Sequence, residues 1–230
     1  MMKLKDILFS QGFGTRYDCE VIAASGAVEI GGVPQTDPER DLDTEGLVFR
    51  WRDIDWVYGE KVVIAMNKPA GYECSMKPSS NPSVMSLLPG PLRTRNVQPV
   101  GRLDVDTTGL LLFTDDGALL HRLTHPKRHV DKVYEVLCKH EVAPGTVEKL
   151  LEGVLLADEK TPVKAKAAEV HDGNHLRLTL TQGKYHQVKR MVAACSNRVE
   201  ALHRVKVGKY ELPGDLAEGQ WRWITRSDIL

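Results

Sequence analysis

The sequence lacks the paired cysteines that redox sites and cysteine-based zinc sites require, and it lacks the long apolar runs of membrane spans. Its four cysteines, Cys19, Cys74, Cys138 and Cys195, lie far apart and form no CxxC pair. We therefore expect buried, reduced thiols. No apolar run approaches the ~20 residues of a membrane-spanning helix, and the amino-terminal residues show no export signal. Together these absences favour a cytoplasmic protein.

An excess of either charge is also missing, because 31 Lys and Arg residues balance 31 Asp and Glu residues. The balance is uneven along the chain. Residues 1–58 carry 6 basic and 11 acidic side chains, a net of −5, whereas residues 59–230 carry 25 and 20, a net of +5. The second part is thus the better candidate for binding a polyanion, although so mild a basic excess is usually only a solvated surface.

The first 58 residues have the pattern of a small module. Apolar residues at helical spacing predict a helix before Gly12 and a second helix with Thr15 as its N-cap. Residues 26–30 and 47–49 are typical of short strands in a hairpin arrangement. We therefore expect two domains, at residues 1–58 and 59–230.

Beyond residue 58, continuous apolar runs and alternating patterns predict a series of strands and helices. Strands are expected at 62–66, 110–114, 133–138, 163–170 and 175–181, and helices after Asp116, at 143–153 and at 186–195. Several of these elements end beside residues capable of chemistry.

The segment 101–109 is the strongest candidate for a functional loop. It places two carboxylates and an arginine directly before the apolar run 110–114, the layout of a loop fixed to a rigid sheet. The spacing Asp104-x-Asp106-x-Thr108 also fits the nucleophile loop of magnesium-dependent phosphatases. In those enzymes the loop follows a hydrophobic strand, whereas here the strong strand comes after it, and no downstream acidic pair completes a magnesium site. The remaining alternative is a salt-bridged turn that only stabilises the sheet.

Two sets of basic residues could each bind an anion or have only a structural role. Lys68 lies in a loop stiffened by Pro69, where it either faces an anion or belongs to a plain turn. His186, Lys189 and Arg190 share one side of a helix start, which suits a phosphate because helix N-termini favour anions. A solvated basic face is the usual explanation of three such residues.

Four segments, in this order, resemble the motifs of the RsuA-type pseudouridine synthases. They are NKPAGYECS at 67–75, GRLDVDTTGL at 101–110 with TDDG at 114–117, KVY at 132–134, and GKYHQVKRM at 183–191. That family isomerises a uridine of small-subunit ribosomal RNA to pseudouridine without a cofactor. The resemblance implies an α+β protein. A small helix-turn-helix and hairpin RNA-binding module, like that of a ribosomal protein, would precede a catalytic domain with a mixed, largely antiparallel sheet flanked by helices.

The resemblance also implies catalytic roles. The family's catalytic aspartate falls on Asp104, which has to be ionised whether it attacks the nucleotide or removes a sugar proton, and those alternatives stay open. Lys189 matches the basic partner of that aspartate. Tyr134 matches the pocket tyrosine, whose ring can stack on the base and whose hydroxyl can transfer a proton at C5. Asp106 is expected to hold the shape of the loop through the neighbouring threonines or backbone.

RNA contacts follow from the same resemblance. Arg102 is expected to contact a phosphate or to fill the gap left by an extruded uridine. Phosphate contacts are also expected from Lys68, His186 and Arg190.

The amino-terminal module departs from the family pattern. It is acidic, and it has Gly26-Ala27-Val28 where Gly-Arg-Val is usual. Arg16, with Lys3 and Lys5, is then its main candidate RNA contact. Substrate docking is expected to depend more on the catalytic domain.

The implied partner is small-subunit ribosomal RNA or an assembly intermediate, bound by a monomer with no metal and no membrane. The nearest alternative is the sister group that acts on large-subunit ribosomal RNA. The segments 106–108, 115–117 and 185–187 favour the small-subunit type. A non-catalytic RNA-binding or ribosome-assembly factor is the alternative from another class, and the presence of Asp104 argues against it.

Overall fold

The computed structural model describes residues 1–230, which form two compact units. The first unit contains Met1–Val62 and Leu88–Gln98, and the second contains Val63–Leu87 and Pro99–Leu230. The sequence led us to assign all of residues 59–230 to one domain. The structure instead assigns a short internal segment to the first unit.

Arg95 shows why that segment belongs to the first unit. Its guanidinium donates hydrogen bonds to the carbonyl oxygens of Gly59 at 2.9 Å and Glu60 at 3.0 Å. It also donates to the side chain of Gln11, which is itself buried. These contacts join residues far apart in the sequence, so no local pattern marks them.

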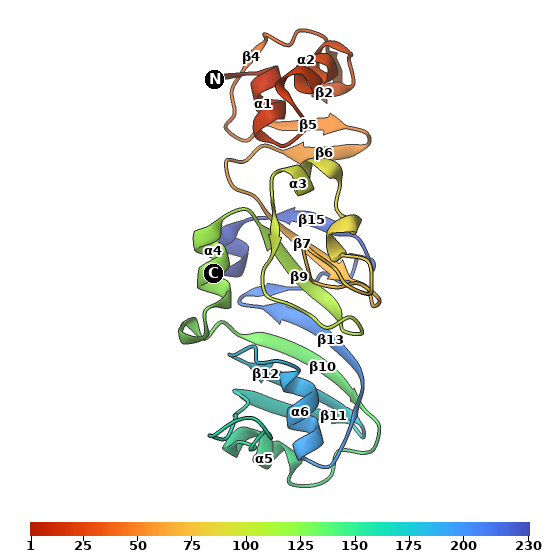
Figure 1. Cartoon of the computed structure of the whole chain (residues 1–230), viewed down its shortest axis with the longest axis vertical. Coiled ribbons are helices and arrows are strands. Elements are labelled where there is room, and N and C mark those ends of the chain that lie inside the picture. The colour runs from red at the N-terminus through yellow and green to blue at the C-terminus, as the bar shows by residue number, and fades with distance from the viewer. The chain divides into compact units, whose positions relative to one another are not determined.

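The first unit combines short helices with two small sheets (Figure 1). Thr15 caps its second helix in a reciprocal capping box with Asp18, as its position in the sequence predicts. Phe13 packs against Phe49, Trp51 and Trp56, with ring centroids 4.9–5.7 Å apart. The elements are β1 (Met2–Lys3), α1 (Leu4–Ser10), α2 (Arg16–Ala24), β2 (Val28–Ile30), β3 (Val33–Gln35), β4 (Asp41–Leu42), β5 (Val48–Trp51), β6 (Ile54–Val57) and α3 (Gly90–Thr94).

The second unit is built on one mixed sheet with the strand order β11-β12-β10-β13-β9-β7-β15 (Figure 1). All neighbours in that order are antiparallel except β13 and β9, which are parallel. The strands are β7 (Val63–Lys68), β9 (Thr108–Thr114), β10 (Lys132–Cys138), β11 (Ala167–Asp172), β12 (His175–Leu180), β13 (Val199–Val207) and β15 (Trp221–Ile224), with β8 (Gln98–Pro99) and β14 (Tyr210–Glu211) at the side. The predicted α+β class with a mixed, largely antiparallel sheet is confirmed.

Helices cover this sheet. Leu119 and Leu123 of α4 and Ile229 of α7 share a core cluster with Ala65 and Leu112 of the sheet. The helical elements are η1 (Val84–Leu87), α4 (Gly117–Thr124), η2 (Pro126–Arg128), α5 (Thr146–Glu152), α6 (Gln187–Ala194) and α7 (Arg226–Ile229). No helix of the chain combines the length and the apolar character that a bilayer crossing would need.

The parallel junction between β9 and β13 depends on Gly109. Its φ is +100°, and a Cβ at this position would lie 2.3 Å from the carbonyl oxygen of Arg204. Only glycine therefore allows the two strands to approach at this point. The loop that carries Asp104 ends here, so the close approach places that loop beside β13.

The cysteines form no disulfide. Cys19, Cys74 and Cys138 are buried and Cys195 is half-buried. Burial raises the pKa of each thiol, to about 11 for Cys19.

Candidate active site

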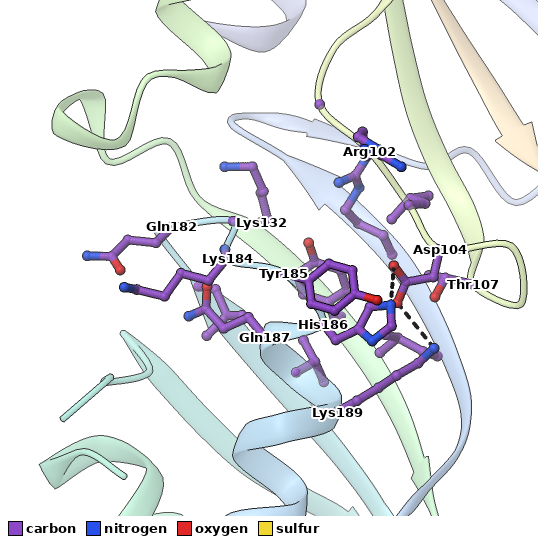
Figure 2. A pocket seen from close by; sticks show the side chains of 18 of the residues that line it. Arg102, Asp104, Thr107, Lys132, Gln182, Lys184, Tyr185, His186, Gln187 and Lys189 are labelled. Carbon is purple, nitrogen blue, oxygen red and sulfur yellow. Dashed lines mark hydrogen bonds and ion pairs between the residues drawn. The ribbon is translucent and has the colours of Figure 1, made fainter. Parts of the chain in front are cut away.

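A cavity of about 430 Å³ opens at the loop that holds Asp104 (Figure 2). Its walls come from this loop, the end of α4, the start of β10, the end of β12, the middle of β13, and the turn that leads into α6 with the first residues of that helix. Its lining includes the polar and aromatic side chains of Arg102, Asp104, Lys132, Tyr134, Tyr185, His186, Lys189 and Arg204.

Lys68 holds the loop from inside. It ends β7, is fully buried, and donates hydrogen bonds to the carbonyl oxygens of Pro69, Asp104 and Thr107 at 3.0, 3.1 and 2.8 Å. Burial lowers the pKa of its ammonium, while the carboxylates of Asp106 and Asp104 act in the opposite direction. The predicted phosphate contact at Lys68 is therefore wrong, because this ammonium has no access to RNA.

Lys189 joins the two carboxylates of the loop. Its Nζ lies 3.1 Å from Oδ2 of Asp104 (Figure 2). The same Nζ lies 2.7 and 2.9 Å from the carboxylate oxygens of Asp106. Burial alone would lower the pKa of Lys189, but the hydrogen bonds and charges of Asp106 and Asp104 outweigh it and raise the pKa.

Asp106 shows the reciprocal effect. Burial alone would raise its pKa, but the hydrogen bond and charge of Lys189 outweigh burial and lower it. The side chain of Asp106 pairs with Lys189 and not with the neighbouring threonines. Of the contacts expected for it, the backbone one is present, since a backbone hydrogen bond also lowers its pKa.

His186 approaches Asp104 from the other side. Its Nε2 lies 3.3 Å from Oδ1 of Asp104, and its ring stacks on that of Tyr185 with centroids 3.8 Å apart (Figure 2). The backbone of His186 is left-handed, with φ of +46°, so α6 begins one residue later than predicted. This conformation is uncommon for a residue with a side chain, and here it turns the imidazole towards the carboxylate.

Tyr134 and Arg204 lie side by side in the floor of the cavity. They are directly opposite in the register of β10 and β13, and both are buried. The hydroxyl of Tyr134 makes no hydrogen bond within the protein. The sequence did not point to Arg204, which occupied an ordinary position in an expected strand.

The other predicted RNA contacts differ in accessibility. Arg102 lines the cavity, is exposed and makes no ion pair. Arg190 is paired with Asp158 and donates to the carbonyl oxygen of Tyr185 at 3.0 Å. His186 and Lys189 contact Asp104, whereas Arg190 pairs outside the cavity, so the three side chains do not gather at one point.

Arg16 belongs to the first unit. It is exposed, lies 3.2 Å from Asp6, and stacks over the Phe9 ring at 4.4 Å. Lys3 and Lys5 both pair with Glu39.

Histidines recur at i and i+4 spacing, at 121 and 125, 125 and 129, and 171 and 175. No three His, Cys, Asp or Glu side chains are arranged to hold a metal ion.

Comparison with known proteins identifies the family. Residues 62–194 match the family model for RNA pseudouridylate synthase. The ribosomal small subunit pseudouridine synthase A of Pasteurella multocida is 37% identical over 99% of this chain and 98% of its own length. The protein of that name from Escherichia coli K12 is 44% identical over 71% of each chain.

An uncharacterized RNA pseudouridine synthase of Bacillus subtilis, YtzG, is 36% identical over 99% of this chain and 97% of its own length. A crystal structure of a pseudouridylate synthase superimposes with a TM-score of 0.70 and 35% identity, covering 100% of this chain and 98% of the other. The chain belongs to the RNA pseudouridylate synthase family, and it is a pseudouridine synthase.

Proposed function

We propose that this enzyme converts one uridine of small-subunit ribosomal RNA to pseudouridine, with Asp104 as its catalytic carboxylate. The observation that carries the proposal is the position of Asp104, which lines a 430 Å³ cavity between Lys189 and His186. Cavities of this size accept a nucleoside-sized ligand. The names of the relatives from P. multocida and E. coli support the choice of RNA.

The reaction breaks the C1′–N1 bond of the uridine, turns the base within the cavity, and joins C5 to C1′. Asp104 has to be ionised in either of its possible roles, as the group that attacks the nucleotide or as the base that removes a sugar proton. Lys189 supplies a positive charge 3.1 Å from this carboxylate. Because Lys189 also binds Asp106, its ammonium is held in place before RNA arrives.

Tyr134 and Arg102 complete the proposed site. The buried ring of Tyr134 offers a surface on which the base stacks, and its unbonded hydroxyl is suited to take the proton from C5. The exposed Arg102 lies at the cavity without an ion pair, so it is free to contact a phosphate or to fill the place of the extruded uridine.

The first unit is proposed to contribute a weaker RNA contact. Lys3 and Lys5 are engaged with Glu39, which leaves Arg16 as its most accessible cation among the three. The catalytic domain then supplies most of the docking. We further propose that the enzyme acts as a monomer in the cytoplasm, on RNA or on an assembly intermediate.

Pseudouridine mapping of ribosomal RNA from cells with and without this gene tests the proposal. We expect one small-subunit position to lose its pseudouridine in the deletion strain and to regain it with wild-type protein but not with Asp104→Ala. Loss at a large-subunit position would assign the enzyme to the sister group. Purified enzyme given naked RNA and assembly intermediates would then identify the form of the substrate.

A further inference from the structure

Two cations in the cavity have no part in the reaction as outlined above. Lys132 begins β10, and Arg204 lies on β13 directly across from Tyr134. Because Lys132 and Tyr134 are two residues apart on one strand, all three side chains share one face of the sheet. All three also line the cavity that Asp104 lines, and Figure 2 shows Lys132 well apart from Asp104.

Neither cation has a carboxylate partner. Arg204 is 2% exposed; its Nε donates to the Leu110 carbonyl oxygen at 2.8 Å, and its Nη2 is buried with no hydrogen-bond partner. Nζ of Lys132 donates only to the carbonyl oxygen of Val130, at 3.1 Å. Lys189, in contrast, already holds two carboxylates. Unpaired buried charge is costly, so this floor is suited to negative charge supplied by a ligand.

The pKa of Lys132 agrees with an ammonium that has no carboxylate partner. Burial lowers its pKa to about 8, the charge of Arg204 acts in the same direction, and Asp131 opposes them. Asp131 does not neutralise the pair, because its own carboxylate bonds Lys166 at 2.6 Å. Lys132 therefore stays mostly protonated at neutral pH beside a second cation.

Among the groups of a nucleotide, the base oxygens fit this position best. Phosphates continue into the RNA chain and stay at the mouth, whereas an extruded base enters first. Uracil offers the acceptors O2 and O4, and lysine and arginine side chains are donors only. Breaking C1′–N1 leaves the electron pair on the base, where it spreads over N1, O2 and O4. Attack of Asp104 at C6 of the base instead would place negative charge on C5 and O4.

We propose that Lys132 and Arg204 bind the carbonyl oxygens of the target uracil and stabilise the negative charge that the base acquires as C1′–N1 breaks. This inference rests on the proposed function. When C5 joins C1′, the electron pair forms the new bond, C5 gives up its proton to a base, and N1 gains one. The base is then neutral again. The two cations stabilise charge that exists only after C1′–N1 breaks and before C5–C1′ forms. Stabilising charge that the bound substrate does not carry lowers the barrier of the reaction.

The Lys132→Met variant tests this pairing, because methionine keeps the apolar stem and removes the charge. Lys206→Met is the matched control: Lys206 lies on β13 opposite Val133, on the other face of the sheet, and pairs with Glu211. At saturating RNA we expect Lys132→Met to lower the single-turnover rate about 10²-fold with near wild-type RNA affinity and thermal unfolding. The Lys206→Met control should match wild type in single-turnover rate, RNA affinity and thermal unfolding.

A second substrate separates charge stabilisation from packing. Fluorine at C5 withdraws electrons and stabilises an anionic base, so the loss caused by Lys132→Met should be smaller for RNA with 5-fluorouridine at the target. Glycosidic bond cleavage is the readout. An unchanged rate with uridine would overturn the inference, and so would weakened RNA affinity with an unchanged rate, which assigns Lys132 to a phosphate. An equal loss on both substrates would also overturn it. Failure of wild type to modify any ribosomal RNA would overturn the proposed function as well.

Discussion

Lys68 donates a hydrogen bond from its buried ammonium to the backbone carbonyl oxygen of Asp104, at 3.1 Å. The same ammonium bonds the carbonyl oxygen of Thr107 at 2.8 Å, so one side chain ties both sides of the turn to the end of β7. The shape of the loop therefore depends on a residue that never meets the substrate. Asp104 is positioned through its backbone by Lys68 and through its carboxylate by Lys189.

Lys68→Met is expected to destabilise the protein and to lower turnover. Methionine matches the length of the stem but leaves the loop carbonyl oxygens without their donor, which costs about 1–3 kcal/mol for a buried group. Denaturant unfolding measures the loss. Lys77→Met, at an exposed lysine, should stay within about 0.5 kcal/mol of wild type. Equal stabilities for the two variants would contradict this role of Lys68.

Asp104→Asn is expected to abolish pseudouridine formation while RNA affinity and folding stay near wild type. Asparagine keeps the shape of the side chain but neither attacks the nucleotide nor takes a proton, and losing such a group costs about 10²- to 10⁴-fold or more in rate. Single-turnover assays measure the rate. Retained turnover by purified Asp104→Asn or Asp104→Ala protein would remove Asp104 from the chemistry.

The Lys189 and Asp106 pair should show a pH-dependent coupling free energy. The lowered pKa of Asp106 means that its contribution is present above the ordinary Asp value near 4 and is lost as pH falls through the folded pKa. The raised pKa of Lys189 means that its contribution is present below about 10.4 and is lost as pH rises through the folded pKa.

A double-mutant cycle with Lys189→Met and Asp106→Asn measures this coupling through unfolding free energies. Because the Asp106 side chain is 71% exposed, we expect only a few tenths to about 1 kcal/mol at pH 7. The coupling should vanish in strong acid. A coupling that persists at pH 2 would show that the interaction is not an ion pair.

Tyr134→Phe is expected to lower the rate about 10²-fold with little change in RNA affinity. Phenylalanine keeps the ring on which the base is proposed to stack and removes the hydroxyl proposed to take the C5 proton. Rapid-quench measurement of product separates the effect on the rate from the effect on RNA affinity. A rate equal to that of wild type would leave only the ring in the mechanism.

Gly109→Ala is expected to be severely destabilising. The new Cβ would approach the carbonyl oxygen of Arg204 to 2.3 Å in a backbone of positive φ, where strain alone costs about 1–3 kcal/mol. Gly117→Ala is the control, since its Cβ would meet nothing within 4 Å. Similar thermal unfolding of the two variants would show that β9 and β13 need no close approach at Gly109.

Short-range chemistry explains what could be predicted from the sequence. The capping box of Thr15 and the N-cap at Asp116 involve residues within three positions, so they are visible in a linear pattern. The strand at β9 follows from a continuous apolar run, which lies buried in the centre of the sheet. The order of the four motifs indicated the family and singled out Asp104, because motif order is a property of the sequence itself.

Contacts between distant segments decided the rest. Lys68 and Arg190 are basic residues within motifs, and nothing local distinguishes a buried lysine or a paired arginine from a phosphate contact. Their partners, the loop carbonyl oxygens of Asp104 and Thr107 and the carboxylate of Asp158, come from other parts of the chain. The sequence by itself determined the family and the main elements, and it put forward Asp104 as the candidate catalytic carboxylate. Only the tertiary structure decided which cations support that carboxylate and which are left facing the cavity, because ion pairing depends on distances that the fold creates.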